Sequence, residues 1–356
     1  MMKKLIFPLL FVLGISTHVD AQKPYKAYMV SNTHLDTQWL WTVQTTIDHY
    51  LYRTLTQNFW LIDHYPGYIF NFEGAVRYQW AKEYYPTEYE RLKNYIKAGR
   101  WNISGSSWDS TDPNIPSPES FFRNLLYGQE FFKKEFGKKS NDIFLPDCFG
   151  FGYTLPTIAA HSGIIGFSTQ KLQHRKLPFY GDHKLPFMFG LWEGIDGARI
   201  MAVPHAQDYV SRFDGQELSN NGKLVDLAKN GLNNTVYHYY GAGDRGGSPT
   251  IASVRSVETG MKGEGPVQII SARSGQLFDD YYPFEKHPEL PVFKGELLMD
   301  VHATGCYTSQ AAMKLFNRRN ELLADAAERA SVVAEWLGGA TYPEEPLRES
   351  WQRFLW

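Results

Sequence analysis

Four side chains in this sequence could together form a metal site with a pair of acidic groups. His34 and Asp36 stand two residues apart at the end of the apolar run AYMVSN, and Asp147 and Asp244 follow later runs of the same kind. A histidine and an aspartate at i and i+2 of an extended segment point to the same side, as two ligands of one zinc ion must. For an isolated His-x-Asp pair, local hydrogen bonds at a strand end are the more common explanation.

The two later aspartates each lie beside a glycine-rich turn. Asp147 stands in LPDCFGFG and Asp244 in YYGAGDRGGSPT. Asp147 could instead cap the following helix, and the turn at Asp244 could simply lead into a helix with Pro249 at its first position. No Gly-Lys-Ser/Thr follows, which disfavours a phosphate cradle. Two carboxylates in separate environments are what glycoside hydrolysis requires, because one attacks or activates water while the other protonates the leaving oxygen.

Short β-rich runs alternate with helical patterns along the chain and would position these residues. This alternation predicts an α/β fold with a parallel sheet, and the number of units favours a barrel of seven or eight strands over an open doubly wound sheet. Catalytic groups of such barrels sit at the carboxyl ends of strands, where all four residues fall. The predicted strands are residues 27–32, 68–74, 100–105, 142–147, 166–171, 199–204, 235–241 and 267–271.

The chain divides into three predicted parts. Residues 1–21 have the basic start, short apolar run and small terminal residue of a signal peptide, so we expect an exported protein, periplasmic or secreted, with no stable membrane anchor. Residues 22–304 would form the barrel. Residues 305–356 would begin a helical module, because the sequence from Ser309 predicts one long amphipathic helix with Thr308 or Ser309 as N-cap and Gly338 as its end.

The overall composition excludes one class of partner. The chain has 356 residues and a formal net charge of -2. Binding a phosphate backbone requires a basic surface, so we expect no nucleic-acid partner. Two cysteines give no disulfide framework.

Six segments of the chain, taken in order, resemble glycoside hydrolase family 38, the class II α-mannosidases. They are HLDTQW, GSSWDSTDPNIPSPESFFRNLLYGQEFF, LPDCFGF, SGIIGFSTQKL, GAGDRGGSPT and GELLMDVHATGCYTSQAAMKLFNRRNE. The chain departs from the common pattern at Ser110, Pro118 and Asn124, which bears on linkage and subsite preference more than on chemistry.

The resemblance implies a (β/α)7 barrel that binds zinc through His34, Asp36 and Asp147. Asp147 would also be the nucleophile, and Asp244 the general acid/base of a retaining α-mannosidase acting on terminal α-linked mannose of a glycan. Zinc would hold ring hydroxyls of the sugar. Two other classes remain open, a zinc-dependent carbohydrate deacetylase and an inactive sugar-binding fragment.

Four further residues are implied in substrate binding. Trp39 would form the floor under the mannose ring, although it could be a core aromatic, and Lys171 would lie near the nucleophile, although it could be a solvated strand end. His205 and Tyr307 are weaker candidates, because VPHAQ and CYTSQ are equally compatible with polar groups at a strand end and a helix start.

The resemblance also predicts that the metal site is incomplete. Family members supply a further histidine after the first long helices, and no histidine follows Ser309 here. We therefore expect a truncated chain with weak zinc binding and little α-mannosidase activity, unless His205 or His302 completes the site. The closing run ESWQRFLW would then leave apolar side chains without packing partners.

Overall fold

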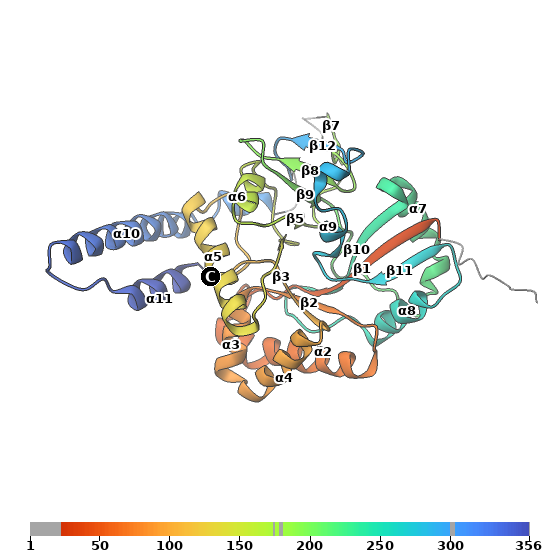
Figure 1. Cartoon of the computed structure of the whole chain (residues 1–356), viewed down its shortest axis with the longest axis horizontal. Coiled ribbons are helices and arrows are strands. Elements are labelled where there is room, and N and C mark those ends of the chain that lie inside the picture. The colour runs from red at the N-terminus through yellow and green to blue at the C-terminus, as the bar shows by residue number, and fades with distance from the viewer. Residues whose placement is uncertain (1–22, 174, 178–180, 300–302, 356) are drawn as a thin grey trace, which may run out of the picture.

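The computed structural model describes residues 23–173, 175–177, 181–299 and 303–355. The predicted signal peptide lies outside these ranges. The described residues form an α/β fold in which helices surround two sheets (Figure 1).

All eight strands predicted from the sequence are present. They are β1 (Tyr25–Thr33), β2 (Phe70–Glu73), β3 (Trp101–Ser104), β4 (Asp142–Phe144), β5 (Gly166–Ser168), β9 (Arg199–Val203), β10 (Thr235–Ala242) and β11 (Val267–Ser271). Four short strands were not predicted, namely β6 (Arg175–Leu177), β7 (Gly181–His183), β8 (Gly190–Glu193) and β12 (Val292–Lys294).

The strands pair mainly in parallel. The first sheet has the order β10-β1-β2-β3, and β11 also pairs with β1. The second sheet has the order β12-β8-β9-β5-β4, in which only β8 and β9 are antiparallel. The β6–β7 pair forms a separate hairpin. Parallel pairing brings the carboxyl ends of the predicted strands to the same edge, as the candidate site requires.

The predicted seven-stranded barrel is not confirmed, because the described strands form two sheets and not one closed ring. The borders of the two sheets meet through other contacts. Ser106 Oγ donates to the Asp142 carbonyl at 2.7 Å, and the Tyr239 N–H donates to the Ala206 carbonyl at 2.8 Å. β3 has four residues and β4 has three, which leaves little length for a ladder between them.

Buried side chains fill the space between the sheets, and helices cover their outer faces. Tyr28, Val30 and Tyr239 from the first sheet share this core with Phe144 and Met201 from the second. Figure 1 shows α2, α3 and α4 along one side of the first sheet. The helices are α1 (Val43–Thr45), the π-helical η1 (Thr46–Leu51), α2 (Tyr52–His64), α3 (Ala75–Tyr84), α4 (Pro86–Lys97), α5 (Pro118–Phe136), α6 (Leu155–His161), α7 (Gly222–Asn230), α8 (Ile251–Met261), α9 (Gln276–Asp280), α10 (Ala311–Trp336) and α11 (Glu344–Phe354), and the 3-10 turns are η2 (Leu218–Asn220), η3 (Leu232–Asn234), η4 (Phe284–Lys286) and η5 (Thr304–Tyr307).

The long helix predicted after Ser309 is confirmed as α10, with a different start. Its N-cap is Gln310, which makes no side-chain capping bond, and not Thr308 or Ser309. The helix ends at Trp336, just before Gly338, whose φ of 74° supplies the left-handed conformation common at helix ends.

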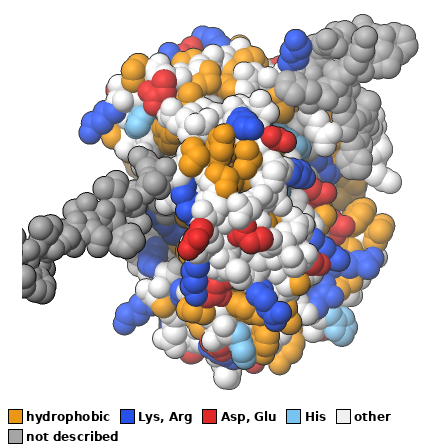
Figure 2. Space-filling model, turned by 90° about the vertical axis from the view of Figure 1, so that its right-hand side faces the viewer, with side chains coloured by type: hydrophobic (Ala, Val, Ile, Leu, Met, Phe, Trp, Pro, Cys, Tyr) orange, Lys and Arg blue, Asp and Glu red, His pale blue; other side chains and the backbone are white. Residues whose placement is uncertain are grey.

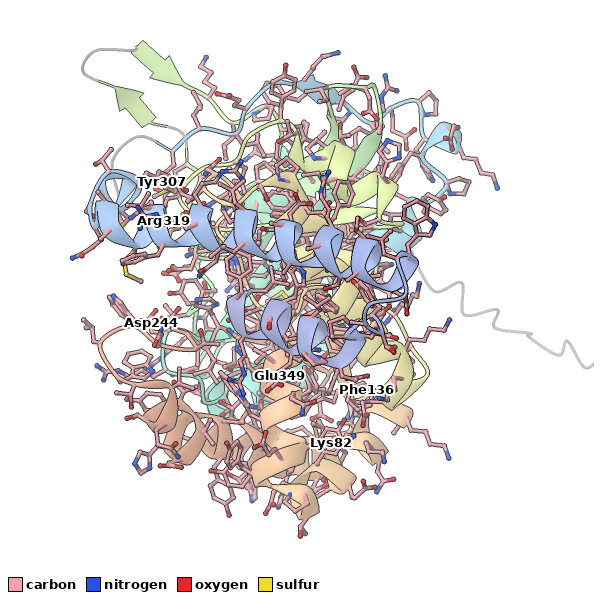
Figure 3. The ribbon with its side chains drawn as sticks, turned by 90° about the vertical axis from the view of Figure 1, so that its left-hand side faces the viewer. Lys82, Phe136, Asp244, Tyr307, Arg319 and Glu349 are labelled. Carbon is pink, nitrogen blue, oxygen red and sulfur yellow. The ribbon has the colours of Figure 1, made fainter. Side chains whose placement is uncertain are left out.

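α10 and α11 lie side by side (Figures 1 and 3), and side chains of both helices bond to α5. Glu321 of α10 is buried, and its Oε1 accepts from the Ser117 N–H at 2.6 Å and from the Ser120 hydroxyl at 2.9 Å. Trp351 of α11 is 1% exposed and donates from Nε1 to Glu328 at 2.8 Å. The expectation that the last apolar side chains lack partners is therefore wrong for Trp351. The predicted domain boundary after residue 304 stays a prediction.

The surface carries mixed charge on the face drawn in Figure 2, where basic and acidic side chains are interspersed. In the described part of the chain, no helix is both long enough and apolar enough to cross a membrane. The absence of nucleic-acid partners stays a prediction.

Candidate active site

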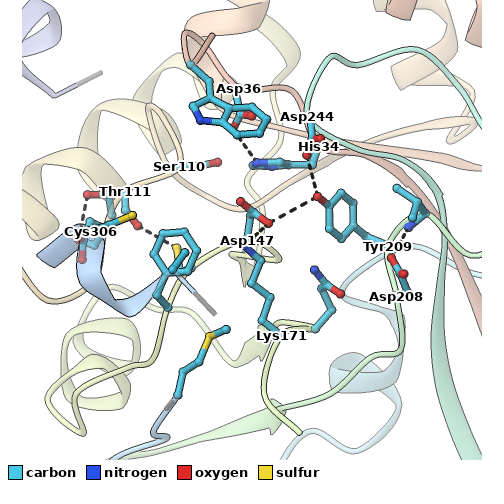
Figure 4. Close-up of a pocket in the computed structure, with 18 of the residues that line it drawn as sticks. His34, Asp36, Ser110, Thr111, Asp147, Lys171, Asp208, Tyr209, Asp244 and Cys306 are labelled. Atoms are coloured by element: carbon cyan, nitrogen blue, oxygen red, sulfur yellow. Dashed lines mark hydrogen bonds and ion pairs between the residues drawn. The ribbon is translucent and has the colours of Figure 1, made fainter. Parts of the chain in front are cut away.

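One pocket of about 940 Å³ gathers seven of the eight predicted site residues. They come from several separate strand ends and from the 3-10 turn η5, and Figure 4 shows the labelled acidic groups converging on a common space. The seven are His34, Asp36, Trp39, Asp147, Lys171, Asp244 and Tyr307.

Pairing between β1 and β10 places the predicted acid/base beside the predicted metal ligands. The ladder runs to Thr33 opposite Ala242 and continues past the strand ends. The His34 N–H donates to the Ala242 carbonyl at 3.0 Å, and the Asp36 N–H donates to the Asp244 carbonyl at 2.8 Å. Residues 208 positions apart in the sequence therefore meet because their strands are neighbours.

His34 lies between two carboxylates. Its Nε2 is 3.0 Å from Asp36 Oδ1, and its Nδ1 is 2.8 Å from Glu73 Oε1. Burial would lower the pKa of His34, but the hydrogen bonds to Asp36 and Glu73 outweigh burial and raise the pKa to about 10. Sequence reasoning missed Glu73, although a signal existed, because this glutamate ends the apolar run of β2 at the same edge as His34.

The predicted nucleophile and acid/base share one tyrosine (Figure 4). The Tyr209 hydroxyl donates to Asp244 Oδ1 at 2.8 Å and lies 3.5 Å from Asp147 Oδ1. Lys171 Nζ lies 2.6 Å from Oδ1 of Asp147, the residue predicted as nucleophile. Burial, then the Asp147 charge and the bond to Asp244, raise the pKa of Tyr209, so its hydroxyl keeps its proton and donates.

Gly243, next to Asp244, leaves the space that the ring of Tyr209 occupies. A Cβ on Gly243 would lie 2.0 Å from Cε2 of Tyr209, so any other residue would displace the ring. Asp244 itself has a φ of 56°, a left-handed conformation that aspartate tolerates better than most residues. The glycine-rich turn therefore allows Tyr209 to approach Asp244 closely.

The remaining predicted residues occupy the rim or lie behind it. Trp39 is 61% exposed at the pocket and makes an edge contact with Trp41. The Tyr307 hydroxyl accepts from Asn114 Nδ2 at 2.7 Å. His205 is not among the described residues that line the pocket; its Nδ1 lies 2.6 Å from the carbonyl of Gln170, which does line it.

The donor set fits a metal in part. The imidazole of His34 and the carboxylate of Asp36 are ligand types that zinc prefers, and a buried carboxylate on the second ring nitrogen is the usual support of a metal-binding histidine. Among the described residues, no three His, Cys, Asp or Glu side chains are grouped as a metal site. His302, considered above as a ligand, lies outside the described residues.

Comparisons with known proteins identify the family of this chain. Residues 24–296 match the family described as glycosyl hydrolases family 38 N-terminal domain. Alpha-mannosidase G of Dictyostelium discoideum is 36% identical over 341 residues, covering 94% of this chain and 30% of that protein. Alpha-mannosidase 2C1 of Homo sapiens is 30% identical over 340 residues, covering 94% of this chain and 31% of that protein.

A solved structure has the same fold. An alpha-mannosidase from Enterococcus faecalis V583 superposes with a TM-score of 0.73 at 20% identity, covering 93% of this chain and 38% of that one. This chain spans about a third of the length of the curated relatives that it matches. Because the family match includes most of the chain and all the strand ends that form the pocket, the chain belongs to glycoside hydrolase family 38.

Proposed function

We propose that this pocket hydrolyses terminal α-linked mannose from glycans with retention of configuration. The observation that carries the proposal is the Tyr209 hydroxyl, which lies 2.8 Å from Asp244 and 3.5 Å from Asp147. The two carboxylate oxygens cannot be farther apart than the sum of these distances. This limit admits the roughly 5–5.5 Å separation of carboxyl groups in retaining enzymes.

Asp147 acts as the nucleophile in this proposal. It attacks the anomeric carbon and forms a mannosyl ester, while the bond to the leaving oxygen breaks. The ammonium of Lys171, 2.6 Å from Asp147 Oδ1, orients the carboxylate before the attack. Trp39 at the pocket rim offers an apolar face to the sugar ring.

Asp244 acts as the acid and then as the base. Its proton passes to the departing oxygen in the first step, and in the second step the carboxylate takes a proton from water as the ester is hydrolysed. Tyr209 donates to the ionised form of Asp244, which is the form needed for the second step. Tyr307 and His205 remain proposed substrate-binding residues.

We further propose that His34, Asp36 and Asp147 would hold one zinc ion. When bound, zinc would hold ring hydroxyls of the mannose and favour the distorted ring of the transition state. The pairing of His34 with Asp36, and the carboxylate behind it, support this assignment. The proposal also includes export to the periplasm or the medium, where glycans would be the partners.

The nucleophile can be identified by chemical trapping. A 5-fluoro-mannosyl fluoride is the probe, because its covalent product accumulates with time. Peptide mapping should find the label on Asp147, and Asp147→Asn should take up none. Asp226→Asn, which changes an exposed carboxylate on α7, is the matched control and should label normally.

Three results would count against the proposal. A label on another residue would displace Asp147 as nucleophile. Release of acetate from acetylated sugars, without mannoside hydrolysis, would favour a deacetylase. Saturable mannoside binding with neither label nor turnover would favour a sugar-binding fragment.

A further inference from the structure

A buried glutamate behind the pocket has a single polar partner. Glu73 ends β2 and is 1% exposed, and its Oε1 lies 2.8 Å from His34 Nδ1. Its Oε2 is buried and has no hydrogen-bond partner among the described residues. A buried carboxylate with so little support is costly unless a positive charge lies beside it.

The fold holds this glutamate against His34 in a fixed register. Thr33 of β1 stands opposite Phe72 of β2, so the next residues along the two strands, His34 and Glu73, are adjacent. On the other side, a Cβ on Gly105 would lie 3.2 Å from Cβ of Glu73, a tight contact that would require a shift of a few tenths of an ångström. Glycine at this position, with a φ of 82°, leaves room for the glutamate.

The contact decides which nitrogen of His34 faces the pocket. With Nδ1 turned to Glu73, only Nε2 remains for the pocket, where it lies 3.0 Å from Asp36 Oδ1. In a neutral imidazole that donates from Nδ1, Nε2 carries the lone pair that binds a metal ion, so a metal ion would take the place of the proton between Nε2 and Asp36.

We propose that Glu73 is a positioning residue that fixes His34 with its proton on Nδ1 and supplies the negative charge that strengthens metal binding at Nε2. The inference rests on the zinc site of the proposed function. Glu73 does not touch substrate, and it acts through the ring of His34.

The chain offers a matched control in Asp142. This aspartate is equally buried, lies on β4, and also has one oxygen without a hydrogen-bond partner in the described part of the chain. Its other oxygen accepts from Ser140 Oγ at 2.7 Å and from the Gly105 N–H. Asp142→Asn therefore shows how much zinc affinity changes when a buried carboxylate that does not contact His34 is neutralised.

Zinc affinity, measured by competition with a chromophoric chelator, tests the proposal. Glu73→Gln keeps an acceptor for Nδ1 and loses the charge, so we expect zinc to bind about 10-fold more weakly. Glu73→Leu loses both, and we expect a loss near 100-fold. Asp142→Asn should bind zinc within about twofold of the unchanged protein, whatever its melting temperature.

A second measurement reads the histidine directly. Long-range ¹H–¹⁵N NMR should show a proton on Nδ1 of His34 in the unchanged protein, and this slowly exchanging proton should be lost in Glu73→Leu. Equal zinc affinity in all variants, or an equal loss in Asp142→Asn, would overturn the inference. If the unchanged chain takes up no zinc, the zinc proposal fails. The positioning of His34 by Glu73 is then tested by the Nδ1 proton alone, and its persistence in Glu73→Leu would refute that positioning.

Discussion

Tyr209→Phe would remove one hydroxyl from the space between the two candidate catalytic carboxylates and leave the ring in place. The ring packs edge-on against His34 at 5.9 Å between centroids and fills the space beside Gly243, and phenylalanine keeps both contacts. The substitution therefore deletes the 2.8 Å hydrogen bond to Asp244 and the longer contact to Asp147 without opening a cavity.

The size of the effect follows from the type of bond. A hydrogen bond to a charged group contributes about 1.5–3 kcal/mol. At about 1.4 kcal/mol per factor of ten, the loss of this bond lowers the rate roughly 10- to 150-fold when the bond stabilises only the transition state of the rate-limiting step. The hydrogen bond donated by Tyr209 would stabilise the Asp244 carboxylate when it acts as base, so the loss should concentrate in hydrolysis of the mannosyl ester.

Aryl α-mannosides of graded leaving-group acidity separate the two steps. With activated leaving groups, where ester hydrolysis limits kcat, Tyr209→Phe should lower kcat by the full amount and show a burst of released phenol. With poor leaving groups the loss should be smaller. Tyr240→Phe is the matched control, because the Tyr240 hydroxyl is buried with no hydrogen-bond partner among the described residues. Equal losses with all leaving groups, or no loss, would refute the assigned role.

Two further changes test the acid/base and the buried interior. Asp244→Asn should retain activity best on substrates whose leaving group needs no protonation, and equal kcat/KM losses on good and poor leaving groups would make Asp244 structural. Burial lowers the pKa of His238 to about 4, so the unfolded chain, with a usual pKa near 6.5, binds more protons between those values. Stability should therefore fall by about 2 kcal/mol from pH 7 to pH 5 through this residue. Urea unfolding should show a weaker pH dependence in His238→Gln, and an unchanged dependence would contradict the assignment.

Strand ends were the most predictable part of the site. Apolar runs end at His34, Asp147 and Lys171, and parallel strands must bring such ends to one edge, so local patterns were sufficient to gather these side chains. Glu73 ends β2 in the same way, so the same pattern points to it. Its side chain contacts His34 from behind and does not line the pocket.

Local sequence patterns could not predict the inward-facing loop residues or the closure of the sheet. Tyr209 lies six residues after β9 in an irregular segment, where no periodicity says which side chain turns inward. Its place depends on Gly243 and Asp244, which are distant in sequence. Closure of a barrel likewise depends on contacts between β3 and β4, strands too short for a pairing pattern to reveal.

A buried ion pair explains why the peptide that carries the predicted ligand pair keeps its conformation. Arg77 donates from Nε at 2.9 Å, and also from Nη2, to the carbonyl of Leu35, the residue between the two ligands. Its Nη1 donates to Asp109 Oδ1 at 2.7 Å, which ties the loop after β3 to the same point. A Cβ on Gly74 would lie 1.8 Å from Nη1, so the loop after β2 must have glycine there.

Removing one partner of such a buried ion pair costs about 3–5 kcal/mol of stability, whereas an apolar replacement of both partners is often neutral, so stability alone does not account for the pair. Its geometry does, because three loops from successive strands converge on one guanidinium that fixes the carbonyl beside His34.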